Sequence, residues 1–66
     1  MAKTYEDIVE YINSHKIRGR YERKNIRQWM INNFPDRTDG IMFFLPIIKT
    51  ENEITYDDFK NFVNND

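Results

Sequence analysis

The stretch ERKNIRQWMINNFP, residues 22–35, decides the fold of this 66-residue chain. Its large apolar side chains, Ile26, Trp29 and Met30, recur at the spacing that places them on one face of an α-helix. The proline that ends the stretch cannot continue a helix, and it pushes the residue before it out of the α region. The stretch therefore predicts an amphipathic helix over about residues 22–33 with one face turned toward a core.

Two further helices are predicted near the ends of the chain. Thr4 and Asp7 precede one over about residues 5–14, and Thr55 and Asp58 precede one over about residues 56–64. A threonine followed three positions later by an acidic side chain is a capping-box variant, which fixes where a helix begins. The apolar positions expected to face the core are Tyr5, Ile8, Val9 and Ile12 in the first helix, and Tyr56, Phe59, Phe62 and Val63 in the last.

Residues 41–48, IMFFLPII, are apolar at every position but the proline and show no periodicity. A helix and a buried strand both fit such a run. Pro46 argues against a central strand, because it cannot donate to the ladder, and it would also break a helix interior. We expect a short buried helix from about Thr38 to Leu45 that Pro46 ends or kinks.

The remaining segments are expected to be irregular. Residues 15–21 form a connector with Gly19 as its turn residue, and residues 49–54 form a polar loop. The absence of cysteine excludes disulfides, and a single histidine argues against structural zinc, so packing must stabilise the chain. We expect an all-α fold, a compact single domain over residues 1–66 with three to four short helices. Its aromatic-rich core would contain Trp29, Phe34, Phe43, Phe44, Phe59 and Phe62.

The overall composition bounds the location and the partners. No apolar run opens the chain or approaches the roughly 20 residues of a membrane helix, so neither a signal peptide nor a membrane partner is expected. The lack of cysteine fits a reducing compartment, and we expect a cytoplasmic protein. Frequent asparagine and isoleucine suggest a phage or low-GC bacterial source. Residues 1–35 carry a net charge of +3 and residues 36–66 of −4, which suggests an oriented binding surface.

A basic segment is the main functional signal. Only Glu22 opposes its cations, so residues 16–27 carry a net charge of +5. If the second helix extends back to residue 20, the last four cations follow the i, i+3, i+4, i+7 spacing of one helix face, which we call the basic stripe. The cations are Lys16 and Arg18, followed by the stripe residues Arg20, Arg23, Lys24 and Arg27.

Three interpretations of this segment stay open. The stripe can neutralise nucleic-acid phosphates, with Tyr21, Gln28 and Asn32 adding stacking or base-edge contacts. It can bind an acidic protein surface, since arginine suits carboxylates equally well. It can also be a solvated surface that pairs with the acidic C-terminal half. We expect a non-enzymatic nucleic-acid-binding or regulatory module. The alternative is a protein–protein interaction module, such as a small phage-type inhibitor or adaptor of a host protein.

A second candidate surface is apolar. Met42, Phe43 and Phe44 follow one another and exceed what one helix face can bury in so small a domain. Burial in the core is one outcome. If part of the run is exposed, it marks a protein interface or a homodimer contact.

Catalysis and metal binding find little support. Ser14 and His15 are adjacent, so on a helix they point to different faces and cannot act as nucleophile and base. No glycine-rich phosphate loop occurs, and we expect no enzyme activity and no cofactor. The run EITYDDF, residues 53–59, resembles the exit half of an EF-hand loop. In that register Ile47 and Lys49 occupy two ligand positions, which excludes a normal calcium site and leaves no metal expected.

A second resemblance concerns the helix that decides the fold. The decapeptide IRQWMINNFP, residues 26–35, is similar to the Ile-x-x-Trp-Met-x-x-x-Phe-Pro run in the second helix of forkhead winged-helix domains. The similarity covers ten of the 66 residues and mostly concerns core positions. The recognition helix that follows in that family has no counterpart here. The resemblance therefore implies a packed helix and no function.

Overall fold

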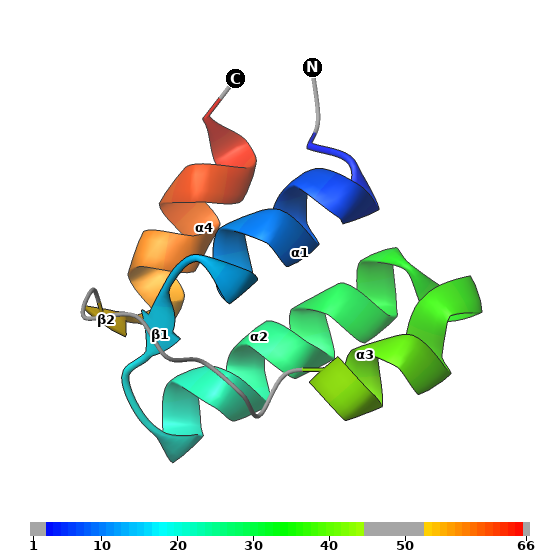
Figure 1. Ribbon diagram of the computed structural model, residues 1–66, viewed down its shortest axis with the longest axis horizontal. Helices are drawn as coiled ribbons and strands as arrows, with labels where there is room; N and C mark the ends of the chain where they lie inside the picture. The colour runs from blue at the N-terminus through cyan, green and yellow to red at the C-terminus, as the bar shows by residue number, and fades with distance from the viewer. Residues whose placement is uncertain (1–2, 45–52, 66) are drawn as a thin grey trace.

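The computed structural model describes residues 3–44 and 53–65, which form four α-helices, one 3-10 helix and two short strands (Figure 1). The all-α fold class is confirmed. In chain order the elements are α1 (Tyr5–Asn13), β1 (Lys16–Ile17), α2 (Arg20–Asn33), η1 (Pro35–Arg37), α3 (Thr38–Phe44), β2 (Glu53–Ile54) and α4 (Tyr56–Asn64).

Capping boxes fix the starts of α1 and α4, as the sequence predicts. The Thr4 hydroxyl accepts the Asp7 amide at 3.1 Å, and the Asp7 carboxylate accepts the Thr4 amide at 3.2 Å. Thr55 and Asp58 make the same two bonds, at 3.1 and 3.0 Å. Each box satisfies amide groups that have no partner within the helix, so each helix begins at a defined residue.

Helix α2 begins two residues earlier than predicted. Gly19 is its N-cap in an extended conformation, with no side-chain hydrogen bond to the first turn. The helix ends at Asn33, and Pro35 opens η1 directly afterwards, which confirms the predicted stop. The early start brings Arg20 onto α2, which is the condition for the basic stripe.

The short ladder between β1 and β2 is a correction to the predicted connector and loop. The two strands pair in parallel, with Lys16 opposite Glu53 and Ile17 opposite Ile54. The amide of Arg18 extends the ladder by donating to the Ile54 carbonyl at 2.8 Å. Both isoleucines of the ladder turn inward and are almost fully buried. The free energy of burying them offsets the entropy lost when the backbone before each helix is held extended.

The helices are arranged as two layers with the core between them. Helix α1 packs against β1 and α4 against β2 and α2, and α3 turns back along α2 (Figure 1). Isoleucine dominates the centre of the core, which is formed by Ile8, Ile12, Ile17, Ile26, Met30, Ile41, Ile54, Phe59 and Val63.

Aromatic side chains surround this aliphatic centre, so the predicted aromatic cluster is present. The Trp29 ring meets Phe59 edge-on at 5.3 Å and Phe34 at 6.2 Å. Tyr11 and Phe62 stack at 3.9 Å and join α1 to α4. Among these aromatic residues only Phe59 is completely buried.

The placement of Phe43 in the core was wrong. Its side chain is 81% exposed, because α3 buries a single face that carries Ile41. Phe44 closes α3, and its side chain lies outside the described structure. The predicted helix end at Leu45, the proline break and the first part of the 49–54 loop also lie outside the described residues.

Candidate nucleic-acid interface

The four residues of the basic stripe all lie on α2. Arg20 and Lys24 are exposed, whereas Arg23 and Arg27 are half-buried beside the core face. Helical geometry explains the difference, since 100° per residue turns Arg23 and Arg27 closer to Ile26 and its buried neighbours. The outermost cations of the stripe are therefore Arg20 and Lys24.

The two earlier cations of the basic segment behave differently from each other. Lys16, on β1, pairs with Glu53 on β2 at 3.5 Å, and both side chains are half-exposed. Arg18 is exposed and follows β1 directly. In residues 3–44 and 53–65, ion pairs are absent from the side chains of Arg18 and of all four stripe residues. The described structure thus pairs one of the six cations, Lys16, with the acidic C-terminal half.

The start of α2 adds a partial positive charge to the same region. A helix N-terminus carries roughly half an elementary charge, concentrated on its free amide groups. Helices α1 and α4 offset this charge with capping boxes and acidic first turns, but α2 begins at an uncapped glycine followed by Arg20. Glu22 is the one acidic residue in its first turn. The first half of α2 is therefore an electropositive surface.

Arg23 carries a buried nitrogen without a hydrogen bond. Its Nε and the Nδ2 of Asn25 are both inaccessible to solvent and have no partner in the described structure. A buried donor left unsatisfied costs about 1–3 kcal/mol. The aliphatic stem of Arg23 still packs against its surroundings, as long cationic side chains commonly do.

We expect Arg23→Met to leave the free energy of unfolding unchanged or to raise it by about 1 kcal/mol. Methionine keeps the packed stem and removes the unsatisfied donor. Urea denaturation followed by circular dichroism measures the change, and Arg23→Ala is the control because it also deletes the stem. A loss of stability as large for methionine as for alanine would show that the guanidinium itself stabilises the fold.

The described structure exposes three large hydrophobic side chains. Tyr21, in the first turn of α2, is 70% exposed. On α3, Phe43 is 81% and Met42 is 52% exposed. Neither Tyr21 nor Phe43 contacts another ring within the described residues, whereas the other described aromatic side chains all do. Two of the three predicted apolar interface residues are thus accessible, and the side chain of the third is outside the description.

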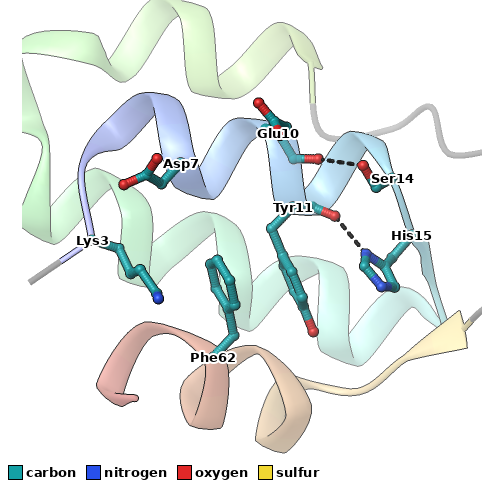
Figure 2. A pocket seen from close by; sticks show the side chains of 7 residues that line it. All are labelled: Lys3, Asp7, Glu10, Tyr11, Ser14, His15 and Phe62. Atoms are coloured by element: carbon teal, nitrogen blue, oxygen red, sulfur yellow. Dashed lines mark hydrogen bonds between the residues drawn. The ribbon is translucent and has the colours of Figure 1, made fainter. Parts of the chain in front are cut away.

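A hollow between α1 and α4 was not anticipated from the sequence. It has a volume of about 420 Å³ and is shown in Figure 2. The His15 ring packs 4.4 Å from Tyr11, and the Lys3 ammonium lies 4.7 Å from the centre of the Phe62 ring. The i, i+4 spacing of Tyr11 and His15 was the available signal, but Phe62 comes from the other end of the chain. The lining residues are Lys3, Asp7, Glu10, Tyr11, Ser14, His15 and Phe62.

The side chains of Ser14 and His15 turn to different backbone carbonyls at the end of α1 (Figure 2). The Ser14 hydroxyl donates to the Glu10 carbonyl at 2.9 Å. His15 Nδ1 lies 2.8 Å from the Tyr11 carbonyl, so this nitrogen carries the proton of the bond. The Glu10 carbonyl also accepts the Ser14 amide at 3.0 Å, and the Tyr11 carbonyl accepts the same amide at 3.2 Å, so both side chains add bonds to carbonyls at the end of α1.

Tyr11 gives the domain a predictable response to alkaline pH. Burial and the nearby negative charge of Asp58 raise the pKa of the Tyr11 hydroxyl above its usual value of 10.0. The folded state therefore holds this proton more tightly than the unfolded state does. We expect the contribution of Tyr11 to stability to be complete below pH 10 and to be lost as the pH rises through the higher folded pKa. Thermal melts from pH 8 to 11.5 measure this, and Tyr11→Phe should melt with a shallower alkaline decline; identical declines would contradict the assignment.

Metal-ligand clusters and membrane-spanning helices are absent from residues 3–44 and 53–65. No three His, Cys, Asp or Glu side chains gather there in a way that could hold an ion. Asp58 is engaged in the capping box of α4, which accounts for the EF-hand-like sequence around it. None of the described helices combines the length and hydropathy needed to cross a bilayer.

Comparisons with protein-family models, curated protein sequences and solved structures gave no significant match.

Proposed function

We propose that this domain binds nucleic acid through the basic face, which we define as Arg18, Arg20, Arg23, Lys24 and Arg27. The observation that carries the proposal is that the four stripe cations lie along one face of α2 and that neither they nor the exposed Arg18 has an ion pair within the described structure. Phosphate contacts by arginine and lysine supply most of the affinity in non-specific nucleic-acid binding. The charge around the basic face suits a polyanion, although the whole chain carries a net charge of −1.

The energetics of α2 support the same proposal. A cation in the first turn of a helix opposes the macrodipole, at a cost of about 0.3–1 kcal/mol. Arg20 stands in that turn, behind an N-cap without a side-chain bond, while α1 and α4 have optimised starts. A polyanion that contacts the free amides and Arg20 together would offset this cost.

Binding titrations with fluorescent oligonucleotides test the proposal. Anisotropy is measured at several salt concentrations between 50 and 200 mM, settings that span the range in which phosphate contacts are screened. We expect a log–log slope of about −3.5 to −4.5 if all five cations contact phosphates. A protein that fails to bind any oligonucleotide at the lowest salt does not have this function.

A protein-binding function is the second candidate, and the exposure of α3 favours it. Phe43 and Met42 present apolar surface that the described core does not cover. Adjacent exposed apolar side chains are typical of sites where proteins meet. The partner would be an acidic protein surface that meets the basic face, or a second copy of this chain that meets α3.

Two measurements distinguish self-association through α3 from binding of a different protein. Light scattering of the wild type and of Phe43→Ser measures self-association, which the serine should abolish if α3 forms a dimer contact. Capture of partners by the wild type and by Met42→Ser/Phe43→Ser tests a different protein. Equal masses and equal capture by all variants would remove α3 as a binding surface.

A further inference from the structure

The exposed ring of Tyr21 lies within the proposed binding surface. Tyr21 precedes Lys24 by three residues, so its side chain neighbours Lys24 on the surface of α2, whereas Arg20, the preceding residue, is turned about 100° away. The ring is 70% exposed and contacts no other aromatic residue in the described structure. A large exposed aromatic beside an exposed cation exceeds what phosphate neutralisation requires.

We infer that the basic face binds single-stranded nucleic acid, with Tyr21 stacking on an unpaired base while Arg20 and Lys24 hold the flanking phosphates. The inference rests on the proposed function and deepens it. Single strands are bound without sequence preference by grooves or faces that combine cations with aromatic stacking surfaces. A base in a duplex has both faces covered by its neighbours, so an exposed ring gains little from it.

The outer amides of α2 argue in the same direction. Gln28 and Asn32 are the side chains on this face best suited to base edges in a duplex groove. The Gln28 amide nitrogen donates to the Asn32 side-chain oxygen at 3.1 Å, so the pair satisfies part of its own hydrogen-bonding capacity. Stacking on Tyr21 requires neither amide and leaves this bond intact.

Competition between strands tests the inference. The protein is titrated by anisotropy with a labelled oligo-dT strand, a labelled oligo-U strand and a duplex of equal length, all at one low salt concentration. We expect single strands to bind at least fivefold more tightly than the duplex, since one stacked base contributes roughly five- to 150-fold in affinity. The dT and U arms show whether DNA, RNA or both serve as the strand.

Variants of Tyr21 separate stacking from charge. Tyr21→Ala should weaken single-strand binding about tenfold and change duplex binding less than twofold, whereas Tyr21→Phe should retain single-strand affinity. Circular dichroism melts of each variant verify folding, which this exposed position should leave intact.

The possible failures are distinct. Equal affinity for strands and duplex, with Tyr21→Ala unchanged, overturns the single-strand inference and leaves phosphate binding in place. Absence of binding to every probe at low salt overturns both.

Discussion

Phe59→Ala is expected to unfold most of the protein at 25 °C. Phe59 is completely buried and packs edge-on against Trp29, between α2 and α4. Truncating a buried phenylalanine costs about 3–5 kcal/mol through lost transfer energy and the cavity left behind. Domains of this length have little stability in reserve, because they bury only about 60% of their unfolded surface. Far-ultraviolet circular dichroism and urea denaturation measure the loss.

Phe43→Ala is the matched control for this substitution. It removes the same atoms from a side chain that is 81% exposed, so its effect on the free energy of unfolding should stay within about 0.5 kcal/mol. If both alanine variants are equally destabilised, the division of the phenylalanines into core and surface is incorrect. If neither is destabilised, Phe59 is not part of the core.

Arg20→Glu/Lys24→Glu is expected to weaken nucleic-acid binding about 100-fold or more at low salt. The substitution removes the two exposed cations of the basic stripe and places repulsive charges against the phosphates. The same change should not harm folding. An acidic side chain in the first turn of α2 favours the helix macrodipole by about 0.3–1 kcal/mol, so the variant should melt at or above the wild-type temperature.

The control Lys3→Glu/Lys60→Glu changes the net charge by the same amount elsewhere. Lys3 lies over Phe62, and Lys60, on α4, lies 5.6 Å from the Tyr56 ring, so neither belongs to the basic face. This variant should bind within about threefold of the wild type if local contacts dominate the long-range field. Equal losses from both double variants would mean that only net charge matters. A melt of Arg20→Glu/Lys24→Glu well below the wild-type temperature would show that the stripe is structural.

Local signals let the sequence predict where most helices begin and end. The threonine–aspartate pairs at Thr4 and Thr55 and the proline after Phe34 act within a few residues, and the structure confirms all three boundaries. The spacing of Arg20, Arg23, Lys24 and Arg27 likewise needed only helical geometry. The predicted stripe therefore lies on one helix once the start of α2 is known.

Tertiary contacts account for what sequence reasoning missed. Ile17 and Ile54 pair across most of the chain, and neither two-residue strand carries a periodic pattern of its own. The exposure of Phe43 depends on which face of α3 meets α2, and the apolar run around it has no periodicity to reveal this. The ion pair of Lys16 with Glu53 also follows from the ladder. The sequence therefore predicted where the basic segment lies, but it could not show that Lys16 is already paired.

The parallel ladder also governs how the domain can form during synthesis. Residues 3–33 contain α1, β1 and α2, yet Ile17 and Ile26 share their core with Ile54, Phe59 and Val63, which are synthesised later. Closing so long a loop costs entropy that only the complete core can offset. The nascent chain therefore exposes these isoleucines until α4 has been synthesised, and the core cannot close before then.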